Sequence, residues 1–198
     1  MSLDDVSSLF SRWAPAPASW QLADGVLTVR ADARTDIFTN PMSGEVKRNA
    51  AMALVGPPEG DWQFSARVRV GFKAPWDAGA LFVRSDEEHW AKLNFEQSPG
   101  GVPSVFSVVT RGRSDDAVAG AVAGEALWLR ISRIDEAFAF HVSDDGSVWR
   151  LVRQFALAGR DGIQVGVEVQ SPIGEGCQVE FDDIRLTPTR LAHLFDGR

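Results

Sequence analysis

A period of two in the hydrophobic residues constrains this chain more than any other feature. Between Trp62 and Val70, apolar side chains alternate strictly with Gln, Ser and Arg. Successive side chains of a β-strand point to opposite faces of a sheet, so this segment is predicted to be a strand with one buried face. Trp62, Phe64 and Val68 are therefore expected to lie in the core.

Segments of this kind recur along the chain and are separated by turn residues. We expect roughly ten to twelve short strands, because turn signals recur about every 8–12 residues and helical periodicity is almost absent. That spacing predicts an all-β fold, a two-sheet antiparallel β-sandwich. The predicted strands are 26–31, 50–55, 62–70, 79–84, 90–97, 104–111, 127–134, 137–143, 148–155, 163–170 and 178–186.

Other stretches are predicted to lie outside the strands. They are a short helical turn at Asp4–Phe10, an irregular proline-containing segment at Trp13–Trp20, loops at Asp32–Gly44 and Gly112–Gly124, and a tail at Pro188–Arg198. No repeat, low-complexity segment or linker interrupts the pattern. The chain is therefore expected to form a single domain over residues 1–198, with a core from about residue 13 to residue 187.

Composition narrows the possible partners. The 198 residues carry a net charge of −7 and contain no basic run, which argues against nucleic acid or an anionic membrane as partner. No secretory signal and no apolar run of about 18 residues is seen, so we expect a cytoplasmic protein. Cys177 is the only cysteine and is expected to be inert packing. The three histidines lack metal-ligand spacing, and no metal or cofactor is predicted.

One predicted strand carries an unusual polar row. Its members, which share one face, are Trp90, Lys92, Asn94 and Glu96. An indole attracts the C–H face of a sugar, and the other three side chains can form directed hydrogen bonds to hydroxyl groups. The row therefore predicts a site for a carbohydrate or a small polar metabolite. A purely structural alternative is that Lys92 and Glu96 pair with each other or with charges across the sheet.

An ordered set of segments covers nearly the whole chain, from about Trp13 to Thr187. Among its members are Thr35-Asp36-Ile37-Phe38, Gly60-Asp61-Trp62, Trp76-Asp77-Ala78-Gly79, Trp90-Ala91-Lys92-Leu93-Asn94-Phe95-Glu96 and Phe181-Asp182-Asp183. Together they resemble a largely uncharacterised family of concanavalin A-like lectin/glucanase domains, sometimes labelled regulation-of-enolase type. The resemblance implies a jelly roll but no particular reaction, because this superfamily includes enzymes, lectins and modules without a known role.

The resemblance also points to individual positions. Those that match the family's recurring residues are Asp36, Asp77, Trp90, Lys92, Glu96 and Thr110. Trp76 stands where the family often has Tyr. We expect Asp36 and Asp77 to border the cleft that contains Lys92, with Asp77 within salt-bridge or single-water reach of it. Alternatively, both aspartates cap turns. Trp76 and Trp90 lie among polar residues and are expected to face a ligand.

Three functions follow from these candidates. The first is a binding module without catalysis, whose concave sheet face holds the carbohydrate or metabolite. The second is a glycan hydrolase, which needs two carboxyl groups and would pair Glu96 with Asp77, Asp36 or Glu168. The Glu-x-Asp-x-Glu strand seen in retaining glucanases of this fold is absent. The third is a protein-interaction or regulatory domain that docks through the sheet face, and the oligomeric state is left open.

Overall fold

The computed structural model describes residues 12–157 and 162–198. Over these residues the chain forms fifteen β-strands and no helix, so no helix there has the length and apolarity to span a bilayer. The helical turn expected at Asp4–Phe10 lies outside the described residues. The all-β prediction is confirmed.

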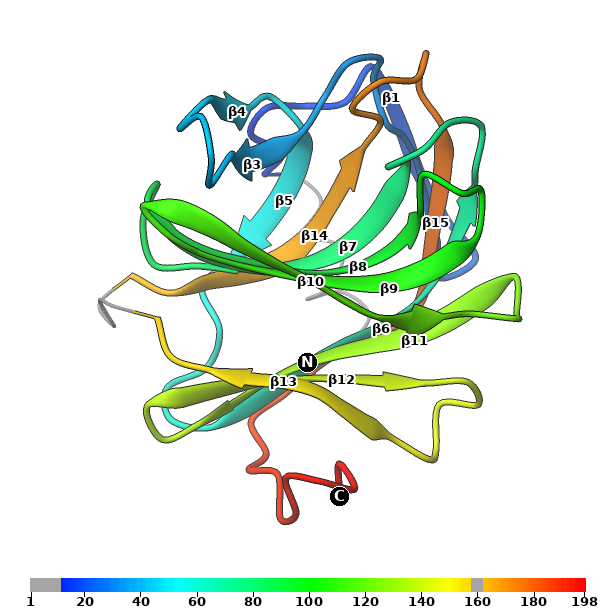
Figure 1. Ribbon diagram of the computed structural model, residues 1–198. Coiled ribbons are helices and arrows are strands. Elements are labelled where there is room, and N and C mark those ends of the chain that lie inside the picture. The colour runs from blue at the N-terminus through cyan, green and yellow to red at the C-terminus, as the bar shows by residue number, and fades with distance from the viewer. Residues whose placement is uncertain (1–11, 158–161) are drawn as a thin grey trace.

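Thirteen of the strands form two antiparallel sheets, which face each other in Figure 1. The seven-stranded sheet comprises, in spatial order, β1 (Ser19–Ala23), β2 (Val26–Arg30), β15 (Gln178–Thr187), β6 (Trp62–Gly71), β11 (Ala126–Ile134), β12 (Ala137–Ser143) and β13 (Arg150–Phe155). The six-stranded sheet comprises β10 (Arg113–Ala121), β9 (Pro103–Arg111), β8 (His89–Gln97), β7 (Ala78–Arg84), β14 (Gln164–Gln170) and β5 (Ala51–Val55). This is the predicted sandwich, with the layers of a jelly roll.

The hydrophobic core lies between the two sheets. Trp62, Phe64 and Val68 enter it from β6, as the alternation predicts, and Trp62 is fully buried against Phe138. Cys177 is also fully buried, and its Sγ lies 3.6 Å from the carbonyl oxygen of residue 170. Burial raises the pKa of this thiol to about 12, so the expectation of an inert cysteine agrees with its surroundings.

A small hairpin covers the other face of the six-stranded sheet. It consists of β3 (Ile37–Thr39) and β4 (Val46–Arg48), and Figure 1 shows it over the side of that sheet turned away from the seven-stranded sheet. Beneath it lies a second apolar cluster that includes Ile37, Phe82 and Trp90. The concave face is therefore partly enclosed.

Three expectations about irregular segments need correction. The predicted loop at Gly112–Gly124 contains strand β10, which pairs with β9 through a bulge between Val118 and Gly120. Because β10 is an exposed edge strand, it carries too few apolar residues to show the alternation. The predicted loop at Asp32–Gly44 contains β3, and the irregular segment ends at Ser19, where β1 begins.

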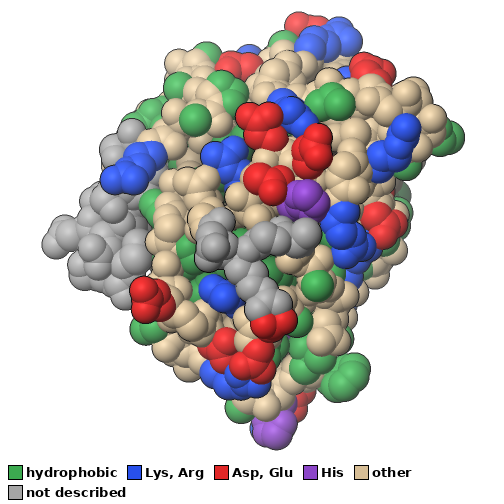
Figure 2. Space-filling model, turned by 90° about the vertical axis from the view of Figure 1, so that its left-hand side faces the viewer, with side chains coloured by type: hydrophobic (Ala, Val, Ile, Leu, Met, Phe, Trp, Pro, Cys, Tyr) green, Lys and Arg blue, Asp and Glu red, His purple; other side chains and the backbone are tan. Residues whose placement is uncertain are grey.

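The C-terminal tail lies across the outer face of the seven-stranded sheet (Figure 1). His141 Nε2 donates to the Leu194 carbonyl at 2.7 Å, and Arg130 donates to the Gly197 carbonyl at 2.6 Å. Burial lowers the pKa of His141 to about 4, so this imidazole is neutral at physiological pH. Figure 2 shows acidic and basic side chains interspersed on another side of the molecule.

Candidate functional site

The polar row predicted on β8 lies on the concave face of the six-stranded sheet. Ala91, Leu93 and Phe95 point into the core, so the residues between them point the other way. The row is nevertheless buried, with exposed fractions between 1% and 4% for Trp90, Lys92, Asn94 and Glu96. These side chains do not form a solvated exterior, and each needs a partner inside the protein or in a ligand.

Lys92 is the buried cation of this site. Its Nζ donates to Gln170 Oε1 at 2.5 Å and lies 3.4 Å from Asp36 Oδ1. Burial by itself lowers the pKa of Lys92, but the negative charges of Glu168, Asp36 and Glu96 outweigh burial and raise it. Lys92 is therefore charged. Its closest acidic contact is Asp36 rather than Asp77.

Two acids near Lys92 hold their protons unusually strongly. Burial raises the pKa of Glu96 to about 8, although Lys92 and a hydrogen bond from Asn94 Nδ2 at 2.7 Å to Glu96 Oε2 oppose the shift. Burial likewise raises the pKa of Glu168, on β14, to about 7. Neither oxygen of Glu168 has a hydrogen-bond partner among the described residues. Such perturbed carboxyl groups are typical of functional sites.

Lys92, Asn94 and Glu96 border a pocket of about 240 Å³, whereas Glu168 lies outside its lining. Small residues on β7 leave room for it, because Ala80 lies opposite Asn94 and Ala78 lies opposite Glu96. Its lining consists of Asp36, Phe38, Lys47, Trp76, Lys92, Asn94, Glu96, Val108, Asp116, Gln170, Pro172 and Ile173. The volume is slightly below the range of about 300–1,000 Å³ usual for drug-sized ligands and fits a smaller molecule.

Trp76 forms an aromatic wall of the pocket in a strained backbone conformation. Its φ of 72° is rare for a bulky residue, and strain of this kind clusters at ligand-binding sites. The indole packs edge-on against Phe106, with 5.7 Å between ring centroids. The Trp76 carbonyl accepts a hydrogen bond from Gln170 Nε2 at 3.2 Å. Trp76 is one of the residues that line the pocket.

Asp77 does not reach Lys92. Its carboxylate is fully buried and accepts hydrogen bonds from Ser171 Oγ at 2.6 Å and from the backbone N–H groups of Lys73 and Ala74. The expected contact with Lys92 was wrong because Asp77 is turned toward its own loop. The turn-capping alternative describes Asp77 better, and through this loop it fixes the position of Trp76.

Trp90 and Thr110 also lie outside the pocket lining. Trp90 stacks on Phe82 at 5.4 Å within the apolar cluster beneath the hairpin, so it does not face the pocket. Thr110 Oγ1 lies 2.8 Å from Ser114 Oγ, which accepts a hydrogen bond from the Thr39 N–H. Both residues therefore support the hairpin that covers the site.

Comparison with known proteins places the chain in a family. The family described as "Protein of unknown function (DUF1349)" matches residues 13–189. The chain belongs to this family. The description does not include the regulation-of-enolase label. The comparison with curated proteins found no match.

Solved structures resemble this DUF1349 domain over most of its length. A functionally unknown protein from Saccharomyces cerevisiae is 27% identical, with a TM-score of 0.79 over 88% of this chain and 94% of its own. Carbohydrate-binding module CBM66 from Bacillus subtilis is 16% identical, with a TM-score of 0.57 and coverages of 88% and 94%. A xylan beta-1,4-xylosidase from Bacillus halodurans is 16% identical, with a TM-score of 0.70 over 89% of this chain but 37% of its own. The last two show the fold alone.

Several residues of the DUF1349 pocket could not be assigned from the sequence. Asp116 lies on the strand β10 that was predicted as a loop, so no face could be given to it. Phe38 reaches the pocket from the hairpin, and Pro172 and Ile173 reach it from the loop after β14. Gln170 shares a strand face with Glu168, and this spacing was the signal for its position.

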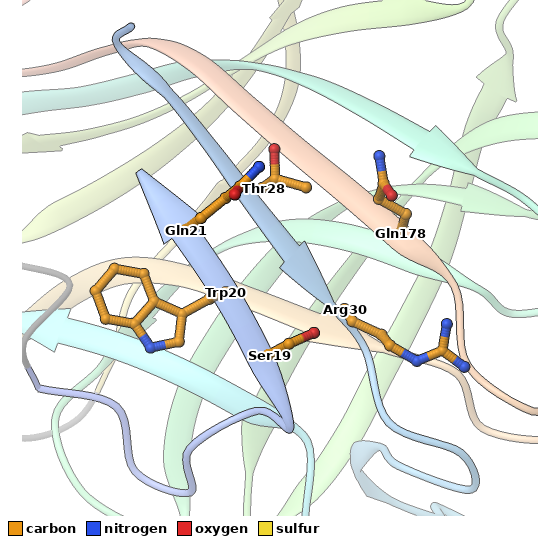
Figure 3. Close-up of a pocket in the computed structure, with 6 residues that line it drawn as sticks. All are labelled: Ser19, Trp20, Gln21, Thr28, Arg30 and Gln178. Carbon is orange, nitrogen blue, oxygen red and sulfur yellow. The ribbon is translucent and has the colours of Figure 1, made fainter. Parts of the chain in front are cut away.

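A second groove of about 250 Å³ lies on the outer face of the DUF1349 sandwich, at edge strand β1 (Figure 3). Thr28, Arg30 and Gln178 line it on one side, and Figure 3 shows the Trp20 ring pointing away from Arg30 and Gln178. All five residues of β1 are exposed, and Arg30 already donates to the Glu175 carbonyl. The groove contains no buried ionisable group, so the concave pocket is the better candidate.

Proposed function

We propose that this DUF1349 domain is a binding module whose concave pocket holds a carbohydrate or a sugar-like metabolite. The observation that carries the proposal is a pocket with an aromatic wall, Trp76, above a buried polar floor formed by Lys92, Asn94 and Glu96. Asn94 Oδ1 is buried and has no hydrogen-bond partner among the described residues. A ligand hydroxyl would satisfy this oxygen and lower the cost of burying it.

The comparisons support this class of ligand without naming one. One fold neighbour is described as a carbohydrate-binding module and another as a xylosidase. A flat, exposed aromatic surface would favour a protein-interaction domain. The concave side does not present such a surface. Trp90 is buried beneath the hairpin, and Trp76 is only partly exposed.

Hydrolysis of a glycan is the second candidate. A general acid needs a carboxyl group that keeps its proton near neutral pH, and the pKa of about 8 for Glu96 meets that need. Asp36 or Glu168 would supply the second carboxylate, whereas Asp77 already accepts three hydrogen bonds, two from its own loop and one from Ser171. Release of a chromophore from aryl glycosides, lost in Glu96→Gln, would support hydrolysis over binding.

Binding can be tested with a panel of mono- and oligosaccharides and polar metabolites. A ligand should raise the melting temperature of the wild-type protein, because binding to the native state stabilises it. Ile173→Ala removes an exposed side chain from the pocket wall and should weaken this shift without changing the melting temperature of the free protein. Val148→Ala, at an exposed residue outside the pocket lining, is the matched control. If both variants respond like wild type to every ligand, the pocket is not the binding site.

A further inference from the structure

Hydrogen-bond acceptors are in excess on the floor of the concave pocket. Asn94 Oδ1 has no partner, and Glu96 accepts its hydrogen bonds from Asn94 and Gln170 on Oε2, so that Oε1 accepts none from the described residues. Both oxygens of the neighbouring Glu168 are also without a partner. Buried acceptors that lack a donor are costly, which points to a donor that the ligand brings.

The donors of the site are largely used within the protein. Gln170 Nε2 directs its hydrogens to the Trp76 carbonyl and to Glu96 Oε2. Lys92 Nζ directs two of its three hydrogens to Gln170 Oε1 and Asp36 Oδ1. With Glu96 and Glu168 in the carboxylate form, which a bound cation favours, one hydrogen of Lys92 and one of Asn94 Nδ2 remain; an acid that keeps its proton adds one O–H donor. The pocket therefore needs a ligand that donates more hydrogen bonds than it accepts.

The charges of the site show the same imbalance. Carboxyl groups from four elements surround the single buried ammonium: Asp36 before β3, Glu96 on β8, Asp116 on β10 and Glu168 on β14. The other cation of the lining, Lys47, is exposed on β4. One buried ammonium cannot compensate four carboxylates, so some of them keep their protons.

We propose that the occupant of this pocket carries a protonated amine beside its hydroxyl groups, as an amino sugar does, and that anionic sugars are disfavoured. This inference rests on the proposed binding function and adds the charge of the ligand. The ammonium would donate to Asn94 Oδ1 and Glu96 Oε1, two acceptors without a partner on the floor. Trp76 would contribute a cation–π contact from the wall.

Binding of such a cation displaces protons. With the pKa of Glu96 at about 8 and that of Glu168 at about 7, both groups are mostly protonated at pH 6.5. A second ammonium beside them favours the carboxylate form, so the carboxylic O–H bond breaks and the proton passes to the buffer. A neutral sugar brings no charge and releases few protons.

The test is titration calorimetry of the wild-type protein with glucosamine, glucose and glucuronate at pH 6.5, where the amine of free glucosamine already carries its proton, in two buffers of different ionisation enthalpy. Glucosamine should bind at least about tenfold more tightly than glucuronate, and its apparent enthalpy should depend on the buffer. Equal affinity for glucose and glucosamine, or a preference for glucuronate, would overturn the inference and leave sugar binding intact. The inference would also be overturned if another ligand of the wider panel binds and glucosamine does not.

A matched pair of variants locates the effect. Asp116→Asn removes a charge that lines the pocket and should reduce the preference for glucosamine over glucose roughly two- to fivefold. Asp115→Asn is the control, because the neighbouring side chain points to the other face of β10 and pairs with Arg153 at 2.9 Å. An equal loss in both variants would overturn the inference. Glu96→Gln, which is isosteric, should reduce the release of protons.

Discussion

Lys92 is the residue on which the concave site most depends. Its ammonium is almost completely buried and is the common neighbour of Asp36, Glu96 and Glu168. Removing one partner of a buried ionic cluster leaves the others uncompensated, which is far more costly than losing a surface ion pair. Binding and stability are therefore coupled at this position.

Lys92→Met should destabilise the protein by about 3–5 kcal/mol at pH 8.5, because buried carboxylates lose their cation. The loss should be smaller at pH 5.5, where Glu96 and Glu168 hold their protons and need no counter-charge. Urea denaturation at the two pH values measures the difference. Equal losses of unfolding free energy at pH 8.5 and pH 5.5 would show that Lys92 does not stabilise the charged forms of Glu96 and Glu168.

Trp62→Ala should cost about 3–5 kcal/mol in the free energy of unfolding, because a fully buried indole is removed and a cavity remains. Trp20→Ala is the control, since Trp20 is 42% exposed at edge strand β1 and should change stability by less than about 1 kcal/mol. The two midpoints in chemical denaturation give the comparison. A small effect at Trp62 would contradict its place between the sheets.

The face of Lys92, Asn94 and Glu96 was predictable because a strand alternates with a fixed period. The surroundings of Trp90 were not predictable, because the hairpin that covers it is distant in sequence and its strands are too short to show a hydrophobic pattern. Asp77 was misplaced for a related reason: its partner Ser171 lies 94 residues away. Strand faces are local information, whereas the contacts of a loop are not.

At the scale of elements, the hairpin β3–β4 determines how enclosed the site is. The Thr39 N–H donates to Ser114 Oγ at 2.9 Å, and Arg113 on β10 donates to the carbonyls of Asn40 and Pro41. These contacts join the hairpin to the edge strand of the six-stranded sheet. An edge strand with few apolar residues is hard to recognise from sequence, although here it supports the cover of the pocket.

Ser114→Ala should leave the buried Thr39 N–H without an acceptor and cost about 1–3 kcal/mol. Amide exchange at Thr39 should become faster, while exchange on β6 should follow only the change in global stability. Ser43→Ala, within the exposed loop of the same hairpin, is the control and should alter neither. Unchanged exchange at Thr39 in Ser114→Ala would contradict this anchoring.

At the scale of the whole molecule, the buried ionisable groups give stability a defined pH dependence. The folded pKa values of Glu96 and Glu168, about 8 and 7, exceed the unfolded value near 4.5, so the folded state binds more protons between these limits. Their contribution is therefore full below pH 4.5 and is lost as pH rises toward 8. His141 acts oppositely, with stability lost as pH falls from 6.5 toward 4.

Between pH 7 and 8, where His141 is largely neutral in both states, most of the pH dependence from these groups comes from the two acids. The free energy of unfolding should fall there by about 1–2 kcal/mol per pH unit, because each extra proton bound in the folded state contributes about 1.4 kcal/mol per pH unit. Glu168→Gln should flatten this slope, because an amide does not titrate. Denaturation curves at half-unit intervals of pH provide the measurement, and a slope unchanged by the substitution would show that Glu168 is not the group responsible.

Cys177 carries the single thiol of the chain, so its rate of chemical modification can report local opening of the fold. It lies between the sheets and against the backbone of Gln170, whose side chain holds Lys92, so a thiol reagent reaches it only when the sandwich opens nearby. Its rate of modification therefore measures how often that opening occurs, without any label having been introduced. A ligand bound in the pocket should slow this modification, and more so as a larger fraction of the protein is bound. An unknown ligand could therefore be recognised from a longer half-time of Cys177 modification.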